Sequence, residues 1–290
     1  MKTNSDDKIK RFIFNNHGVR GEIVRLHNSL QDFSSMGYPE CVQKILMELS
    51  ACAILVASTL KDGSEVMLQI RGQESSPLRY ALINVREDLS FYGSAAKNEE
   101  LNIDENDSIL TLFGKDAVLV LSIFPKDGVK WQGIVELKTD SIQSSLMEYF
   151  EHSSQLPTHF IIHTDVKQHI CGGIMLQIIP EIKDNVNSLE HLTVLSETLS
   201  SDEMFSLDYT DILRRLYAYE DVQTFFDKEI AYKCICSKQR CENALEKLSP
   251  AELLSMASDP MGTSMTCQHC KRTYTFTKEE LMHLYHKISQ

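Results

Sequence analysis

Positive charge is in short supply in this sequence. Its 29 lysine and arginine residues are outnumbered by 41 aspartate and glutamate residues, which gives a formal net charge of −12. Nucleic-acid binding depends on lysine and arginine side chains that neutralise phosphates, and binding to an anionic membrane surface depends on the same charges. We therefore expect neither nucleic acid nor a membrane as a partner.

Long apolar runs are also lacking. No stretch reaches the roughly 18 apolar residues expected of a membrane span, since the longest apolar run covers only residues 51–57. Residues 1–14 contain Asp6 and Asp7 but no apolar run typical of a secretory signal. We expect the protein to be cytoplasmic, and thiols normally stay reduced in the cytoplasm. Its eight cysteines should then be metal ligands, redox thiols or core residues before they are structural disulfides.

The motifs of several enzyme classes are missing. The sequence has no P-loop, no dinucleotide-binding glycine fingerprint, no His-Glu-x-x-His and no Gly-x-Ser-x-Gly. His159, His163 and His169 lie close together in sequence, but ordinary surface or edge positions explain them better than a ligand set. No cysteine has a convincing histidine partner for nucleophilic catalysis. We predict that the protein is not an enzyme.

The apolar pattern predicts an α+β protein with a largely antiparallel or mixed sheet. Apolar residues at spacings of three and four predict a long helix over residues 38–60, followed by a turn at residues 61–63, and a second helix begins at Ser141. Strands are expected within residues 10–26, 66–70, 78–85, 117–124, 131–137, 160–163 and 173–179. Strands and helices do not alternate regularly, which favours this class over a parallel βαβ fold.

Three parts are expected along the chain. Residues 1–180 form an N-terminal mixed sheet-and-helix domain, residues 181–230 an amphipathic helical linker, and residues 231–290 a small C-terminal module. The linker has leucine stripes at helical spacing and no glycine, which is typical of helices that lie on a neighbouring domain. Gly172 and Gly173 predict a tight turn or bulge before the last strand of the first domain.

Two helix starts and a hairpin are expected in the C-terminal module. Ser249 and Thr277 are each followed three residues later by glutamate, which is the capping-box pattern of a helix N-terminus. Residues 265–267 and 273–276 flank a short cysteine-containing turn and are expected to pair as a hairpin.

Two close cysteine pairs carry the chemistry of this module. Cys234 and Cys236 are separated by 30 residues from Cys267 and Cys270. Four thiolates suit a tetrahedral Zn²⁺, and a module this small benefits from a metal that ties its segments together. We therefore predict a zinc site at these four residues. The close pairing also allows each couple to form a disulfide if the metal leaves.

Other cysteines and a histidine offer alternative ligands. Cys241 follows Cys236 closely and could replace one member of the set, although its surroundings look helical. His269 lies between two ligands and is expected to point away. An iron–sulfur cluster is possible, but the spacings do not match the common ferredoxin patterns. The three remaining cysteines lie in apolar surroundings and are expected in the core: Cys41, Cys52 and Cys171.

The C-terminal pattern closely resembles the zinc module of the 33-kDa heat shock protein family. The resemblance rests on residues 234–245, on Cys267-x-x-Cys270 and on Tyr274-Thr-Phe276. Weaker motifs of this family follow in the right order: Tyr38-Pro39, Thr59-Leu60-Lys61-Asp62-Gly63, Trp131-Gln132-Gly133-Ile134-Val135, Tyr149-Phe150, Gln155-Leu156-Pro157-Thr158 and Gly172-Gly173. The chain departs from the family at residues 72–77, at Trp131 and at residues 36–37, and none of these changes affects the expected fold.

The resemblance implies a redox-regulated, ATP-independent holdase chaperone. Cys234, Cys236, Cys267 and Cys270 would hold Zn²⁺ in the reduced protein. Oxidation would form the disulfide Cys267–Cys270 first and then Cys234–Cys236, expel the metal and unfold the module. The linker would then expose its apolar stripes to unfolding client proteins. The resemblance also implies that the active, oxidised form is a homodimer, with client binding and dimerisation in residues 1–180.

A rival reading treats the zinc as purely structural. The module would then be a zinc ribbon attached to a binding domain for a protein or a nucleic acid, without redox switching. The negative charge weakens the nucleic-acid version. Reversible loss of zinc on oxidation distinguishes the two hypotheses, because a structural site should resist mild oxidation.

Overall fold

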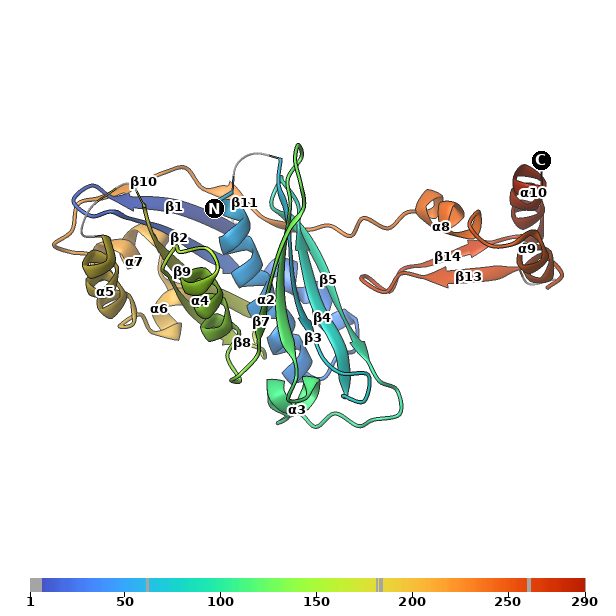
Figure 1. Cartoon of the computed structure of the whole chain (residues 1–290), viewed down its shortest axis with the longest axis horizontal. Coiled ribbons are helices and arrows are strands. Elements are labelled where there is room, and N and C mark those ends of the chain that lie inside the picture. Colours follow the sequence, from blue (N-terminus) through green and yellow to red (C-terminus); the bar gives the residue numbers. More distant parts are fainter. Residues whose placement is uncertain (1–6, 61–62, 181, 183–184, 260–261, 290) are drawn as a thin grey trace. The chain divides into compact units, whose positions relative to one another are not determined.

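A computed structural model of the chain describes residues 7–60, 63–180, 182, 185–259 and 262–289 (Figure 1). Parts of three expectations fall outside them: positions 1–6 of the N-terminal segment, residues 61–62 of the turn and residue 181 at the start of the linker. The chain forms two compact units, Met1–Lys233 and Cys234–Gln290. Each unit contains both strands and helices, which confirms the α+β class. A functional division of the first unit at residue 180 stays a prediction.

Two sheets form the framework of the first unit. The strands of the first sheet are β1 (Lys8–Phe14), β2 (Val19–Leu26), β8 (Thr158–Asp165), β9 (Ile170–Ile178), β10 (Val222–Thr224) and β11 (Lys228–Glu229). Their order is β10-β1-β2-β9-β8, and β11 also pairs with β1. All of these pairs are antiparallel, as expected.

The second sheet is also antiparallel except at one edge. Its strands are β3 (Glu65–Arg71), β4 (Leu78–Val85), β5 (Ser90–Lys97), β6 (Val118–Phe124), β7 (Trp131–Glu136) and β12 (Ala231–Tyr232). The order is β12-β5-β4-β3-β6-β7, and β12 pairs with β5 in parallel. Strand β5 was not expected, because small residues buried on both of its faces hide the alternation of apolar and polar positions.

Helix α2 (Glu40–Ser58) is packed between the two sheets. It contacts β2, β8 and β9 on one side and β3, β4 and β5 on the other. With a mean hydropathy of 1.6 it has the length and composition of a membrane span, so the expectation that no segment would reach this length is wrong. However, 78% of its apolar stretch is buried inside the protein. Its composition is explained by this position, since a core helix needs apolar residues on every face.

Shorter helical segments accompany α2. They are the 3₁₀ turn η1 (Asn28–Leu30) and helices α1 (Gln31–Ser35), α3 (Ile109–Phe113) and α4 (Ile142–His152). Helix α4 begins where the sequence predicted it, because the Ser141 hydroxyl accepts a hydrogen bond from the Ser144 amide at 3.1 Å.

Gly172 and Gly173 do not form the expected turn or bulge. Both lie inside β9, in continuous register with β2 and β8. A Cβ atom on Gly173 would lie 2.2 Å from the carbonyl oxygen of Ile161, and one on Gly172 would lie 2.9 Å from that of Val24. The glycines are therefore needed for the close approach of neighbouring strands.

Replacing Gly173 with alanine should destabilise the first unit by about 1–3 kcal/mol, because the new methyl group would push β8 away from β9. Chemical denaturation of the reduced protein measures this loss. Gly37→Ala gives the opposite case for comparison, backbone strain without a clash, since a Cβ there meets nothing within 4 Å but its φ is +71°. Equal stability of Gly173→Ala and the parent chain would contradict the packing argument.

Helices α5 (Asn185–Ser196), α6 (Ser201–Ser206) and α7 (Tyr209–Leu216) form a helical layer on the other face of the first sheet (Figure 1). Their inward side chains join those of β1, β2 and β9 in an apolar group distinct from the one around α2. This covered cluster consists of Phe12, Phe14, Val19, Ile23, Ile174, Leu176, Ile178, Leu189, Leu192, Leu199, Met204, Tyr209, Ile212, Leu213, Leu216 and Tyr217. The linker helices thus lie on the first domain, as their amphipathic pattern predicted.

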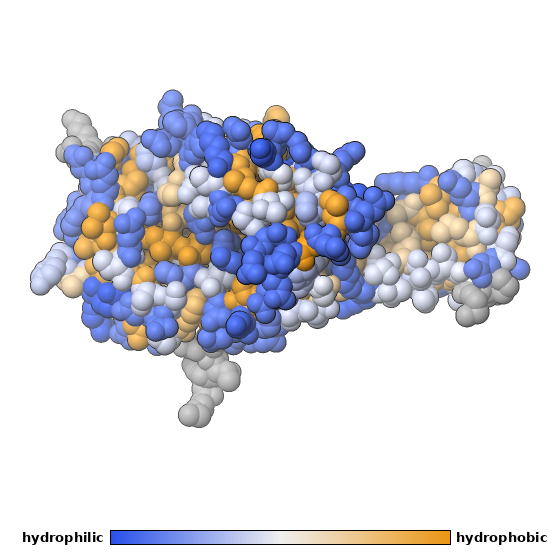
Figure 2. All heavy atoms as spheres, turned by 90° about the horizontal axis from the view of Figure 1, so that it is seen from below, coloured by the Kyte–Doolittle hydropathy of each residue, from blue (hydrophilic) through white to orange (hydrophobic). Residues whose placement is uncertain are grey.

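The outward side of the layer is more polar. Val186 and Val194 of α5 are exceptions, and their side chains are exposed. The face of the molecule in Figure 2 likewise shows hydrophobic residues scattered among hydrophilic ones. The apolar residues of the helical layer therefore mostly face the sheet.

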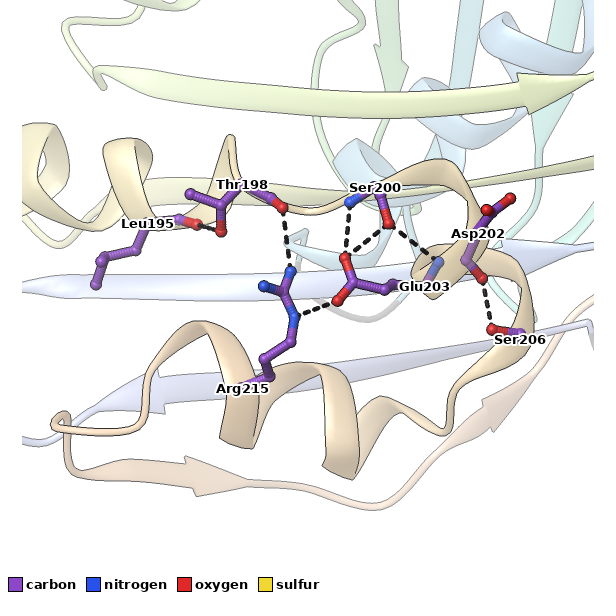
Figure 3. A network of polar contacts seen from close by, with 7 residues as sticks. All are labelled: Leu195, Thr198, Ser200, Asp202, Glu203, Ser206 and Arg215. Carbon is purple, nitrogen blue, oxygen red and sulfur yellow. Dashed lines mark hydrogen bonds and ion pairs between the residues drawn. The ribbon is translucent and has the colours of Figure 1, made fainter.

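A polar network holds the layer together (Figure 3). The Ser200 hydroxyl accepts a hydrogen bond from the Glu203 amide at 3.3 Å, while the Glu203 carboxylate accepts one from the Ser200 amide at 3.0 Å. Glu203 also pairs with Arg215 of α7, with Oε1 2.6 Å from Nε. Arg215 donates in turn to the carbonyl oxygen of Thr198 at 3.2 Å. It therefore joins α7 to the turn between α5 and α6.

The expectation of helix up to residue 230 is wrong for the last part of the linker. Residues 222–224 and 228–229 are strands that pair with β1. Phe225, between them, donates its amide to the carbonyl oxygen of Arg11 at 2.9 Å. The edge of β1 offers a row of backbone partners, and this tertiary pairing overrides the weak helical pattern.

Candidate metal centre

The C-terminal unit is a small helical and hairpin structure that brings two distant segments together. Its elements are α8 (Lys238–Leu245), α9 (Pro250–Ala257), β13 (Thr263–Thr266), β14 (Thr273–Phe276) and α10 (Lys278–Ile288). Ser249 and Thr277 both form the expected capping boxes, and β13 pairs with β14 as the expected hairpin. Cys234 and Cys236 precede α8, while Cys267 and Cys270 occupy the turn of the hairpin.

Backbone hydrogen bonds shape the hairpin turn. The Cys267 amide donates to the carbonyl oxygen of Arg272 at 2.9 Å, and the Lys271 amide donates to that of Cys267 at 2.9 Å. Lys271 has a φ of 58°, so the chain reverses through a left-handed residue directly after Cys270. On the other segment, the Ser237 hydroxyl caps α8 and fixes the chain beside Cys236.

The four predicted cysteines meet at one point. Their Sγ atoms all lie within 4.8 Å of one another. Two contacts join the two segments: Cys234 Sγ lies 3.6 Å from Cys267 Sγ, and Cys236 Sγ lies 3.3 Å from Cys270 Sγ. A disulfide needs about 2.05 Å, so these are thiols in contact. The arrangement could hold a metal ion.

The surroundings affect the thiols unequally. Burial raises the pKa of Cys234 and, to a smaller extent, that of Cys270. Burial also acts on Cys236, but hydrogen bonds from Tyr274 and the neighbouring thiols outweigh it and lower its pKa. The Tyr274 hydroxyl donates to Cys236 Sγ at 3.2 Å. This role of Tyr274 was missed in the sequence, where alternation along β14 was the only signal for its direction.

The alternative ligands do not join this group. Within the described part of the chain, the metal-competent set consists of the four paired cysteines and includes neither Cys241 nor His269. Cys241 lies on α8, as expected, and packs against the apolar core of the unit. Cys41, Cys52 and Cys171 are buried in the first unit, as predicted.

The dispersed histidines also take ordinary positions. His159 and His163 lie on β8, at the edge of the first sheet. His159 Nε2 is 3.5 Å from Glu197 Oε1, and His163 Nδ1 is 3.0 Å from the Ser201 hydroxyl. Both contacts join the sheet to the helical layer, which is a structural role.

The apolar core of the C-terminal unit is small. Its buried members are Leu245, Leu253, Ala257, Phe276, Leu281 and Leu284. Two surface ion pairs also contribute to the stability of the unit: Lys238 with Glu280, and Lys287 with Glu246. Exposed pairs stabilise a fold weakly, so a core of this size leaves the unit in need of a further constraint.

Comparisons with known proteins agree with this architecture. The family model described as Hsp33 protein matches residues 7–277. A 33 kDa chaperonin of Pseudoalteromonas atlantica is 38% identical over 280 residues, covering 94% of this chain and 93% of the relative. One of Salmonella typhi is 33% identical over 286 residues, covering 98% and 96%.

A solved structure shares the fold. The crystal structure of the 33 kDa chaperonin (heat shock protein 33 homologue) of Thermotoga maritima has a TM-score of 0.80, with 24% identity, and the match covers 98% of this chain and 100% of that one. The expected resemblance is thereby confirmed over nearly the whole sequence. This chain belongs to the Hsp33 family, a family of chaperones and not of enzymes.

Proposed function

We propose that this protein is a redox-regulated, ATP-independent holdase that binds unfolding proteins after oxidation. The observation that carries the proposal is the group of four thiols that joins two segments of a unit with little core of its own. A chemical change at these thiols removes the main constraint on that unit. Family membership supports the chaperone activity itself.

We propose Zn²⁺ as the metal. Zn–S bonds of about 2.3 Å at tetrahedral angles place the sulfur atoms roughly 3.8 Å apart. The two separations between the segments, 3.3 and 3.6 Å, lie near that value and need only a small expansion. Thiolate ligands select soft or borderline metals over Mg²⁺ and Ca²⁺. When bound, the ion holds Cys234, Cys236, Cys267 and Cys270 as thiolates and ties the α8 segment to the hairpin.

Peroxide is the proposed oxidant. A thiolate attacks one peroxide oxygen, the O–O bond breaks, and the sulfur becomes a sulfenic acid while hydroxide or water leaves. A second thiolate then attacks the sulfenic sulfur, the S–S bond forms and the oxygen leaves as water, so each pair of thiols gives two electrons to one peroxide. We propose the pairs Cys267–Cys270 and Cys234–Cys236, which the resemblance implies, with Cys267–Cys270 forming first.

Loss of the metal should unfold the C-terminal unit. Lys233, the last residue of the first unit, donates its amide to the carbonyl oxygen of Phe91 at 2.8 Å, and Cys234 follows it directly. We propose that unfolding spreads through β12 and β10 to the helical layer and exposes the covered cluster to clients. We further propose a homodimer in the oxidised state, a cytoplasmic location, and no nucleic-acid or membrane partner.

The test combines chemistry with client protection. Zinc release, free thiols and light scattering of a heat-denatured model client should be followed in one peroxide titration. The reduced protein should retain zinc and protect poorly, whereas the oxidised protein should lose zinc and suppress aggregation. Reduction with dithiothreitol and added zinc should reverse both changes.

Cys241→Ala provides a matched control, because this cysteine lies outside the group of four. It should release zinc and gain activity like the parent chain. Equal protection by the reduced and oxidised proteins would refute the switch. Retention of zinc throughout mild oxidation would favour the structural zinc ribbon.

A further inference from the structure

The turn between β1 and β2 meets the helical layer at a carboxylate shared by two histidines. His17 Nε2 lies 2.7 Å from Glu220 Oε2, and His191 Nε2 lies 2.9 Å from Glu220 Oε1. On its other side, His17 Nδ1 lies 3.0 Å from the hydroxyl of Ser188. Both Nε2 atoms face carboxylate oxygens, so both donate. We call these four residues the Glu220 junction.

The junction joins three segments that are far apart in sequence. His17 belongs to the β1–β2 turn, Ser188 and His191 to α5, and Glu220 to the segment between α7 and β10. The backbones also meet there, since the Asn15 amide donates to the carbonyl oxygen of Asp221 at 2.9 Å.

The packing around the junction is tight. A Cβ atom on Gly18 would lie 2.8 Å from Cβ of Ile182 and 2.9 Å from Cβ of Asn185, which starts α5. The turn and the start of α5 are therefore in close contact. Separation of the two segments requires the Glu220 contacts to break.

The surroundings of Glu220 favour its charged form. Hydrogen bonds from His191 and His17 lower the pKa of this carboxyl group despite partial burial. Its side chain is only 13% exposed, so its hydrogen bonds compete little with water. Hydrogen bonds to a charged and shielded acceptor are stronger than those between neutral groups.

Glu220 has a different role from the polar network around Arg215. Arg215, Glu203 and Thr198 brace the helices against one another, within the layer itself. Glu220 instead attaches α5 and the end of α7 to a turn of the sheet. Breaking its contacts would release α5 and the end of α7 from the β1–β2 turn, but it would leave the contacts of Arg215 within the layer intact.

We propose that Glu220 is a latch that keeps the helical layer closed over the covered cluster in the reduced protein. The inference rests on the proposed function for its consequence, because exposure of this cluster is the step that would admit a client. In the proposed activation, the latch opens after the metal has left and the C-terminal unit has unfolded. It determines how readily the layer opens once the C-terminal unit has unfolded.

The test is hydrogen–deuterium exchange of the reduced, zinc-loaded full chain. In Glu220→Ala, amides of α5 and of residues 15–18 should exchange about tenfold faster, with a smaller increase in Glu220→Gln, which keeps neutral hydrogen bonds. Zinc content should not change. Glu197→Ala is the matched control: it removes another histidine–glutamate pair of the layer, at 3.5 Å, from a side chain that is 58% exposed. Exchange in the control should match the parent chain.

An exchange rate of α5 in Glu220→Ala within about twofold of the parent or the control would overturn the latch. If Glu220→Ala also loses amide protection in α2, the whole first unit has been destabilised. Amide exchange of His191→Ala then tests the latch instead. That variant removes one contact of the two and should speed exchange in α5 alone. Exchange requires no client, so a chain that never protects a client would refute the proposed function while leaving the latch result valid.

Discussion

Replacing Cys267 with serine should abolish stable zinc binding and unfold residues 234–290, while the core around α2 stays folded. A serine hydroxyl is a poor replacement for a thiolate, and the remaining three ligands leave the hairpin turn attached through Cys270 alone. Structural zinc contributes on the order of 10 kcal/mol to such modules. The apolar core of this unit is too small to replace that contribution.

Zinc stoichiometry and amide exchange of the purified variant measure this outcome. Residues 234–290 should exchange at unprotected rates, whereas α2 should retain full protection, because its core is separate. Cys241→Ser is the control, since it removes a thiol from the same unit but outside the group of four. One zinc per chain and a protected hairpin in Cys267→Ser would contradict the assignment of this ligand.

The second large effect is expected from Leu192→Ala in α5. The Leu192 side chain is fully buried in the covered cluster, so its truncation should destabilise the helical layer by about 2–5 kcal/mol. A weakened layer opens more often. We therefore expect the variant to suppress client aggregation without peroxide, while its zinc remains bound.

Light scattering under reducing conditions, with zinc measured in the same sample, provides the readout. Val194→Ala is the matched control, because Val194 lies on the same helix with 64% of its side chain exposed. It should remain inactive until oxidised. A reduced Leu192→Ala protein that is destabilised yet inactive would show that the covered cluster is not the surface that binds clients.

Local patterns in the sequence were sufficient for much of the fold. The apolar periodicity of residues 38–60 predicted α2, and the serine and threonine caps placed α9 and α10, because these signals act within a few residues. The strands β10 and β11 could not be predicted in the same way. They depend on the edge of β1, which lies about two hundred positions away in sequence.

In the candidate site, too, the short-range features could be predicted from the sequence and the long-range contacts could not. Two close cysteine pairs indicated the group of four without any knowledge of the fold, since chelating pairs are short-range features. The contact of Tyr274 with Cys236 and the cross-segment sulfur neighbours depend on how the hairpin meets the segment before α8. The prediction of a turn or bulge at Gly172 and Gly173 was wrong for a related reason. The requirement for glycine comes from strands that are distant in sequence.

The capped helices and the short hairpin of the C-terminal unit have a kinetic consequence. Helix α9 begins with a capping box and packs on α10, which also begins with one, and β13 and β14 are joined by a six-residue turn from Cys267 to Arg272. Contacts between segments close in sequence form quickly, since little loop entropy is lost before they are made. A chain of this kind should therefore recover its structure rapidly when thiols and metal return, so that recovery time is limited by disulfide reduction and not by folding.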